Sequence, residues 1–575
     1  MAAAIFFGCS ISPPSLMDDV DAVQAQIARN MLDSGDWVTA RLDGVAYLEK
    51  APLPYWMMAV SYMIFGVHDW AARIPFALCA VLLCWITARF ATWAFGARAG
   101  LIAGLALATC VGLFLFTRIL IPDAMLTLTL TLAMWSLLRA LDEEEKRPRL
   151  WAFVLAASIA VGLLLKGLIA ALFVVCGGGL YLLFTKQLFK RRAWQRICPF
   201  SGVVVILIIA APWHVLATLR NPPYFDFTMR SEPGAYHGFF WFYFLNEHVF
   251  RFLNMRYPRD YNTVPRALFW GLHLVWLFPW SVFFPAAARL NYKPVDRAGR
   301  TRLLALCWAG FILLFFTLST TQEYYSLPCY PALALLIGSA AAANGAWIRG
   351  GVRAIAVVAA LAAIVIGALL FLVRGMPAPG DISSALTQNP DIYTLSLGHM
   401  TDLTLRSFAY LKTPLAVAGI AFLGGALGAW LLKGLRAFLA TAAMMVLFTH
   451  AARIAMVAFD PYLSSRPLAE ALRQAPRGNL IVDDQYYTFS SVFFYTNRRA
   501  LLLNGRINNL EYGSYAPGAP RVFIDDGEFQ RLWGGAGIYY LVAADTAKSR
   551  LERLVGRSAL RVVAASGGKA LYANR

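Results

Sequence analysis

Carboxylates gather near the start of the chain in a pattern that suits acid–base chemistry. Asp18, Asp19 and Asp21 stand directly before 22–32, a segment with helical character. Such a group can activate an acceptor as a general base, bind a cation or cap the following helix. Capping needs only one aspartate, and carboxylates are costly to keep beside a bilayer, so a functional role is favoured. Asp123 begins a later helical segment, where capping is the simpler interpretation.

Two lysines lie next to apolar segments, where an anionic partner would stabilise their ammonium groups. Lys166 lies between two apolar runs with almost no loop, so its ammonium group needs an anion or access to water, and a phosphate would serve. Lys50 follows Glu49 and precedes the amphipathic stretch 55–66, which is too short to span a membrane. Lys50 could pair with a lipid phosphate, or it could form a surface pair with Glu49.

Two further motifs combine charged and aromatic residues. Glu247–Phe252 contains His248 and Arg251, which could orient a substrate or bind a cation. Glu49 and His248 are the candidate ligands for a divalent cation, although two ligands do not make a metal site, and no cofactor is assigned. In Gln322–Pro328, the hydroxyl of Tyr325 could bond a phosphate, or the ring could belong to an interfacial aromatic belt.

The elements that carry these motifs are predicted to be membrane-spanning helices. The chain has 575 residues, 59% hydrophobic and 14% charged, and this composition excludes an ordinary soluble protein. Its apolar runs predict a polytopic α-helical membrane protein with about 12–13 transmembrane helices. Twelve candidate spans lie near 71–95, 99–116, 119–139, 151–165, 167–185, 199–219, 266–288, 302–318, 327–346, 353–374, 413–432 and 435–459. The apolar piece Ala2–Leu16 is too short to span and is interpreted as the outer end of a further helix.

The distribution of charge predicts the orientation of these spans. The chain carries 51 Lys and Arg against 32 Asp and Glu. The basic residues concentrate in alternate short loops, which the positive-inside rule places in the cytoplasm, so the excess implies no nucleic-acid partner. The other side receives the long segments 17–70, 220–265 and 375–412 of a membrane domain that covers 1–459. It also receives 460–575, whose short β-like runs and helical stretches predict a soluble α/β domain.

In their order along the chain, these motifs resemble the bacterial GT-C type glycosyltransferases that use polyprenyl-phosphate sugars. That group includes the protein O-mannosyltransferases and the aminoarabinose lipid A transferases. After the acidic motif, the shared segments are Arg29–Trp37, Tyr47–Pro52, Ile121–Asp123, Leu165–Gly167, Glu247–Phe252, Phe278–Trp280 and Tyr324–Pro328. Each segment alone is a weak signal, whereas their order and spacing together are specific.

The resemblance implies inverting transfer of a sugar from an undecaprenyl-phosphate donor to an envelope acceptor, and aminoarabinose transfer to lipid A matches best. A protein or another glycan is the alternative acceptor, and a lipid or sugar transporter is the alternative class. The resemblance also implies a multi-pass protein of the bacterial inner membrane, in contact with membrane lipids. Its active site and C-terminal domain would be periplasmic.

The resemblance further implies roles for particular residues. Asp19 or Asp21 would be the catalytic acid/base, with Asp18 as its neighbour and Asp123 as a second acid. Which aspartate acts stays open, because 18–21 replaces the family's usual Asp-Glu pair. The carrier-lipid phosphate would be held by Lys50 and Lys166, and more weakly by Arg251 and Tyr325. Cations stabilise a departing phosphate while a carboxylate prepares the attacking oxygen.

Overall fold

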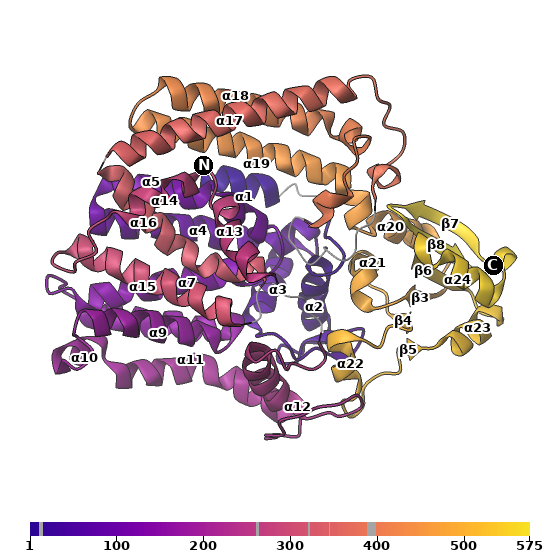
Figure 1. Cartoon of the computed structure of the whole chain (residues 1–575). Helices are drawn as coiled ribbons and strands as arrows, with labels where there is room; N and C mark the ends of the chain where they lie inside the picture. The colour runs from indigo at the N-terminus through magenta and orange to yellow at the C-terminus, as the bar shows by residue number, and fades with distance from the viewer. Residues whose placement is uncertain (11–14, 260–263, 320–321, 344, 388–397) are drawn as a thin grey trace.

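The computed structural model describes residues 1–10, 15–259, 264–319, 322–343, 345–387 and 398–575. Long helices lie side by side in one block, and the C-terminal α/β domain packs at one end of it (Figure 1). In this part of the chain, nine helices are long and apolar enough to span a membrane. They are α4 (Asp69–Phe95), α7 (Asp123–Leu141), α8 (Pro148–Lys166), α10–α11 (Arg191–Arg220), α15 (Arg297–Leu318), η3–α16 (Glu323–Ala342), α17 (Ala346–Val373), η7–α18 (Ser407–Leu431) and α19 (Leu435–Leu463).

Two predicted spans are broken helices, which raise the number of spans to at most eleven among the described residues. The pair α5 (Ala97–Ala108) and α6 (Val111–Thr117) bends by 50°, and α13 (Arg266–Trp276) with η2–α14 (Trp280–Ala288) bends by 99°. The predicted span 167–185 is α9 (Ile169–Phe184), which has only 16 residues. Of the twelve predicted segments, nine are therefore long apolar helices among the described residues, two are broken helices and one is a shorter helix.

The two helix breaks lie next to each other, and polar groups freed at one break form hydrogen bonds with the other. The backbone N–H of Val111 donates to the carbonyl of Phe278 at 3.2 Å, and the indole of Trp280 donates to Thr109 Oγ1 at 2.9 Å. Because hydrocarbon offers no hydrogen bonds, a broken helix persists in a membrane only where its freed polar groups find protein partners. The segment Phe278–Trp280 thus has a structural role in the described fold.

The residues that precede α4 pack at the end of the helical block that carries the α/β domain. They form α1 (Ala2–Ser10), α2 (Asp21–Ser34), the hairpin β1 (Arg41–Leu42) and β2 (Val45–Ala46), and α3 (Leu53–Phe65). In the predicted amphipathic stretch 55–66, Tyr55, Met58 and Tyr62 are buried, whereas Met63 and Ile64 are exposed. Helix α3 therefore presents one apolar face to the protein and another to its surroundings, as an interfacial helix would. Part of the piece Ala2–Leu16 lies outside the described residues.

The C-terminal domain is built on a six-stranded sheet with the order β5-β4-β3-β6-β8-β7. Strands β3 (Asn479–Asp483), β4 (Ala500–Leu503), β5 (Phe523–Ile524) and β6 (Tyr539–Ala544) are parallel, and β7 (Arg561–Ser566) and β8 (Lys569–Ala573) complete the sheet antiparallel. Its helices are α20 (Arg466–Gln474), α21 (Ser490–Thr496), α22 (Asn508–Ser514), α23 (Asp526–Gly534) and α24 (Lys548–Val555). The predicted α/β domain is confirmed, although β4, β7 and β8 were not among the predicted strands.

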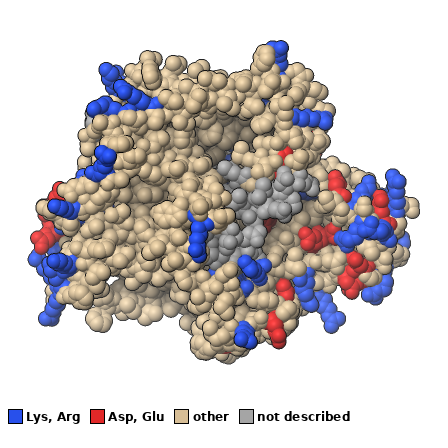
Figure 2. Space-filling view, viewed as in Figure 1, with Lys and Arg blue, Asp and Glu red and all other residues tan. Residues whose placement is uncertain are grey.

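The charged side chains are distributed unevenly over the surface. Lys and Arg gather along the edge of the helical block away from the α/β domain and again over that domain, and the face between is largely uncharged (Figure 2). Helix α10, in one of the basic loops, lies at this far end (Figure 1). An uncharged belt between two charged ends is the arrangement expected of a protein that spans a bilayer.

Candidate functional site

Seven of the predicted site residues line one cavity of about 540 Å³. They are Glu49, Lys50, Asp123, Lys166, His248, Arg251 and Tyr325. The rest of the lining is mainly apolar and comes from α9, the end of α15 and the segment 243–252. Leu172 and Val175 of α9 line the cavity and are also exposed on the side of the helical block, Val175 by 64%. The cavity therefore combines a charged end with an apolar end that reaches the lipid-facing surface.

The charged end contains a close pair formed by Asp123 and Lys166. Asp123 is the first residue of α7 and is 1% exposed, and Lys166 is the last residue of α8. Lys166 Nζ lies 2.5 Å from Asp123 Oδ1 and 4.8 Å from the centre of the Tyr325 ring. Within the described chain, Asp123 Oδ2 has no hydrogen-bond partner. Asp123 thus has one oxygen fixed by a cation and a second that can meet a ligand.

A second ion pair joins the neighbours Glu49 and Lys50. Glu49 is 7% exposed and accepts hydrogen bonds from Lys50 and, at 2.9 Å, from the hydroxyl of Tyr47. Burial alone would raise the pKa of Glu49, but Lys50, Arg256 and Arg251 outweigh burial and lower this pKa to about 2. Glu49 is therefore a buried, charged part of the cavity wall, whereas the side chain of Lys50 is 34% exposed. The pair lines the cavity and is not a simple surface pair.

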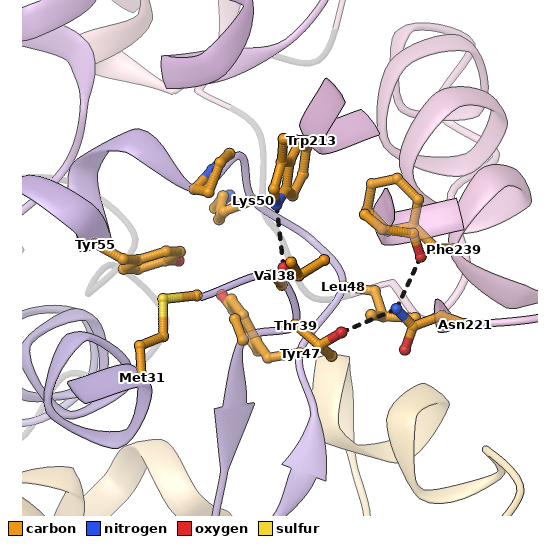
Figure 3. A pocket seen from close by; sticks show the side chains of 13 residues that line it. Met31, Val38, Thr39, Tyr47, Leu48, Lys50, Tyr55, Trp213, Asn221 and Phe239 are labelled. Atoms are coloured by element: carbon orange, nitrogen blue, oxygen red, sulfur yellow. Dashed lines mark hydrogen bonds between the residues drawn. The ribbon is translucent and has the colours of Figure 1, made fainter. Parts of the chain in front are cut away.

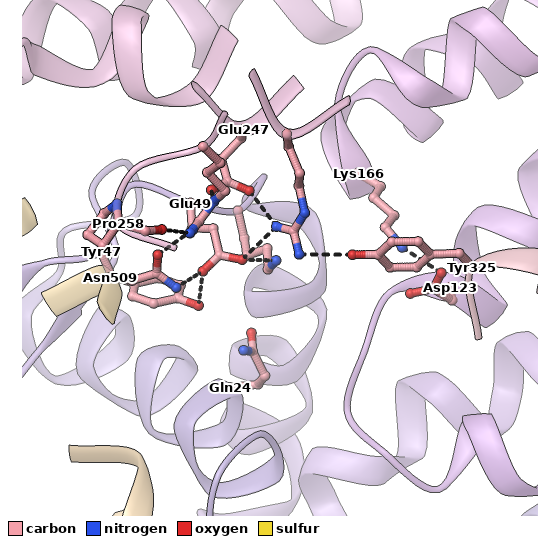
Figure 4. Close-up of polar contacts among 12 residues, drawn as sticks. Gln24, Tyr47, Glu49, Asp123, Lys166, Glu247, Pro258, Tyr325 and Asn509 are labelled. Carbon is pink, nitrogen blue, oxygen red and sulfur yellow. Dashed lines mark hydrogen bonds and ion pairs between the residues drawn. The ribbon is translucent and has the colours of Figure 1, made fainter. Parts of the chain in front are cut away.

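Arg251 connects this wall to Tyr325. Its Nη1 lies 2.8 Å from Glu247 Oε2, and its Nη2 donates to the Tyr325 hydroxyl at 2.9 Å. Glu247 and Arg251 lie on one face of η1 (Trp241–Phe250) and its continuation, a helical turn apart. Arg256 contacts the other oxygen of Glu247. Figure 4 shows Glu49 and Glu247 on one side of this network, with Tyr325, Lys166 and Asp123 on the other.

His248 holds the backbone beside Lys166. Its Nδ1 lies 2.6 Å from the carbonyl of Tyr243, and its Nε2 accepts the N–H of Leu168 at 3.1 Å. Burial lowers the pKa of His248, in keeping with a neutral ring that donates from Nδ1 and accepts at Nε2. Gly167, with φ of 72°, lies so close that a β-carbon there would stand 2.3 Å from Nε2. His248 therefore fixes the turn that presents Lys166.

This arrangement gives no support to the cation predicted at Glu49 and His248. Both ring nitrogens of His248 are engaged, and Lys50, Tyr47 and Asn509 contact Glu49. Among the described residues, no group of three or more His, Cys, Asp or Glu side chains is placed to hold a metal ion.

The acidic motif at 18–21 lies outside this cavity. Asp21 is fully buried, pairs with Arg73 at 3.1 Å and accepts the N–H of Leu120 at 2.9 Å. Asp18 accepts four hydrogen bonds, all from the α/β domain and its connection: from Ser465 Oγ, from the N–H and Oγ of Ser491, and from Lys569 Nζ. Asp19 is exposed, with φ of 72°. The roles implied for these aspartates would place them beside Lys50 and Lys166, but none of the three is among the described residues that line the cavity.

Three residues of the site were not among the predicted ones. The hydroxyl of Tyr243 lines the cavity and has no hydrogen-bond partner in the described part of the chain. Arg256 and Asn509 are buried behind the wall and contact Glu247 and Glu49. An arginine close to the Glu247–Phe252 motif could have been suspected, whereas no sequence signal points to an asparagine of the soluble domain.

A second, much smaller cavity of about 10 Å³ is also lined by Lys50. Its walls are braced by Trp213, which donates to the carbonyl of Val38 at 3.1 Å, and by Asn221, which donates to Thr39 Oγ1 at 3.1 Å (Figure 3). It has room for about one water-sized molecule. The larger cavity is therefore the candidate site.

Fold and site together define a polytopic membrane protein whose charged cavity lies at the end of the helical block that carries the α/β domain. Residues 49–215 match the family model described as dolichyl-phosphate-mannose-protein mannosyltransferase. The whole chain superposes on the crystal structure of ArnT from Cupriavidus metallidurans bound to undecaprenyl phosphate, with a TM-score of 0.82, 24% identity and 96% coverage of that chain. The apo ArnT structure gives a TM-score of 0.77 at 23% identity. The chain thus has the ArnT fold.

The sequence is also similar to those of curated proteins. The undecaprenyl phosphate-alpha-4-amino-4-deoxy-L-arabinose arabinosyl transferase of Aeromonas salmonicida is 30% identical over 360 residues, which cover 59% of this chain and 60% of that protein. The protein of the same name from Pseudomonas aeruginosa is 28% identical over 356 residues, which cover 59% of this chain and 58% of the relative. The predicted resemblance to GT-C type glycosyltransferases is confirmed, and the matched region spans about three fifths of these relatives.

Proposed function

We propose that this protein is an inverting glycosyltransferase that moves a sugar from an undecaprenyl-phosphate donor to an envelope acceptor, with aminoarabinose and lipid A as the pair that fits best. The observation that carries the proposal is the cavity itself, where Lys50, Lys166 and Arg251 meet an apolar passage to the lipid-facing surface. A lipid-linked phosphate has this combination of an anionic head and a long apolar tail. The names of the relatives supply the identity of sugar and carrier.

The proposed reaction places each charged group at a reacting atom. An acceptor hydroxyl attacks the anomeric carbon, the bond from that carbon to the phosphate oxygen breaks, and undecaprenyl phosphate leaves with the electron pair. The free oxygen of Asp123 takes the proton of the hydroxyl, while Lys166 holds the other oxygen of the carboxylate. Lys50, Arg251 and the Tyr325 hydroxyl stabilise the charge that grows on the phosphate. Attack on the face opposite the leaving group inverts the anomeric centre.

We further propose that the protein lies in the bacterial inner membrane with the cavity mouth and the α/β domain in the periplasm. The basic loops at the opposite end of the helical block support this orientation by the positive-inside rule. A periplasmic active site fits a lipid-linked donor, because nucleotide sugars are absent there.

The test is transfer by the purified protein in lipid nanodiscs. Undecaprenyl-phosphate aminoarabinose is supplied with lipid A or with a hydroxyl-containing protein acceptor, and released undecaprenyl phosphate and acceptor mass are measured. Transfer to lipid A supports the full proposal, and transfer only to protein keeps the chemistry but replaces the acceptor. Binding of the donor without release of carrier phosphate would contradict the proposal and favour a transporter.

A further inference from the structure

The α/β domain reaches the cavity wall through the side chain of Asn509. Asn509, in α22, is 6% exposed although the domain is largely outside the helical block. Its Nδ2 donates to Glu49 Oε2, and its Oδ1 accepts from Arg256 Nη2. Figure 4 shows Asn509 beside Glu49 and Tyr47, on the side of the network away from Lys166.

Asn509 thereby connects the two branches that end in the proposed phosphate-binding cations. On one branch, Glu49 holds Lys50. On the other, Arg256 contacts Glu247, whose second oxygen lies 2.8 Å from Arg251. Among the described contacts, Arg251 also links the two acidic residues, but its contact with Glu49, at 3.8 Å, is longer than its contact with Glu247.

The position of Asn509 is fixed by its neighbours in α22. The ring of Tyr512 stacks on Phe242 with centroids 4.2 Å apart, and its hydroxyl donates to the carbonyl of Gly238 at 3.0 Å. Tyr257 donates to Glu511 at 2.8 Å. A β-carbon at Gly513 would stand 2.0 Å from the carbonyl oxygen of Ala46, so α22 lies directly on β2. Helix α22 is therefore a docked part of the site.

We propose that Asn509 is a positioning residue through which the α/β domain sets the separation of Lys50 and Arg251 for the donor phosphate. This inference rests on the proposed function. The amide suits the place because it can donate to a carboxylate and accept from a guanidinium without adding charge. A carboxylate there would repel Glu49, and an apolar side chain would leave both Glu49 and Arg256 short of a buried partner.

The experiment replaces Asn509 by its isostere. Asn509→Asp keeps an acceptor for Arg256, removes the donor to Glu49 and adds a like charge beside it. We expect the affinity for undecaprenyl phosphate to fall at least about tenfold, and the KM for the donor to rise more than kcat falls. The matched control is Asn479→Asp, at the exposed start of β3 in the same domain, which should bind like the wild type. Thermal unfolding of both variants monitors folding.

A reciprocal exchange separates positioning from a general structural defect. In the double variant Glu49→Gln with Asn509→Asp, the amide at position 49 can donate to the carboxylate at 509, so the combined loss of affinity should be smaller than the sum of the two single losses. Unchanged binding and KM in Asn509→Asp, or a loss in the double variant equal to that sum, would overturn the inference. Failure of the wild type itself to bind undecaprenyl phosphate would instead contradict the proposed function.

Discussion

At the scale of single residues, substitution of Asp123 is expected to slow the proposed transfer reaction. Asp123→Asn preserves the shape of the side chain and an acceptor for Lys166, but it removes the base that takes the proton of the acceptor. We expect transfer to slow by about 10²-fold or more, with undecaprenyl phosphate still bound. Single-turnover transfer and carrier binding measure the two effects, and Asp33→Asn, at an exposed position of α2, serves as the control. Transfer at the wild-type rate would remove Asp123 from the mechanism.

Substitution of Asp21 is expected to lower the stability of the folded protein. Asp21→Asn leaves the guanidinium of Arg73, which is 4% exposed, buried without its charged partner. Removing one partner of a buried pair costs about 3–5 kcal/mol, so the unfolding temperature in detergent should fall clearly. Combining Asp21→Asn with Arg73→Met should recover part of the loss. A fully stable Asp21→Asn variant without transfer would return Asp21 to the catalytic role that the motif implied.

The residues that sequence reasoning could find are those whose charge conflicts with their surroundings. Lys166 stands out because an ionised group between apolar runs needs an anionic partner or access to water. Asp123 alone would be interpreted as a helix cap, and only the resemblance assigns it a role in catalysis. Asn509 could not be found in this way, because asparagine is common in loops and its contact with Glu49 joins segments 460 residues apart. The aspartates at 18–21 are grouped in sequence, but one face of the turn packs on Arg73 and the other on the α/β domain.

At the scale of elements, the hairpin β1–β2 contains a carboxyl group that should make stability depend on pH. Burial raises the pKa of Asp43 to about 7, against smaller opposing effects of the Ala500 N–H and Arg499. Between about pH 4 and pH 7 the unfolded chain releases this proton while the folded chain keeps it. The stabilisation is therefore complete below about pH 4, declines as pH rises and is lost above pH 7.

This dependence can be removed by one substitution. Asp43→Asn should remove the pH dependence that Asp43 gives to the free energy of unfolding. That contribution amounts to at most about 4 kcal/mol over those three pH units. The measurement is the unfolding temperature of both proteins at several pH values in that window. If the difference between them does not change with pH, Asp43 does not titrate in the predicted way.

The sequence predicts a helix or strand where hydropathy alone determines it. It does not predict a feature that depends on contacts with distant parts of the chain. The apolar runs gave the helices, because a bilayer core demands about 20 apolar residues. They could not show the 99° bend between α13 and η2–α14, because the bend depends on polar partners in α5–α6. Strand β4 is a four-residue apolar run whose identity as a strand depends on its parallel partners β3 and β5.

At the scale of the whole molecule, the α/β domain contacts the wall of the charged cavity. The acidic motif binds the α/β domain through Asp18, and α22 returns to the cavity wall through Asn509. The domain that the sequence presents as an appendage is thus tied to the membrane domain both at the start of the chain and at the proposed donor site. Both connections lie at the end of the helical block that carries the charged cavity.

The proposed orientation of the chain in the membrane can be measured. Arg192 is 71% exposed in the basic loop that contains α10, and Arg521 is exposed in the α/β domain. In intact cells with a permeabilised outer membrane, a membrane-impermeant maleimide should label Arg521→Cys, and it should label Arg192→Cys only after the inner membrane is lysed. The eight native cysteines are replaced beforehand, since Cys176 and Cys198 are only partly buried. Labelling in the reverse order would place the cavity in the cytoplasm, where nucleotide sugars are available, and would remove the reason for a lipid-linked donor.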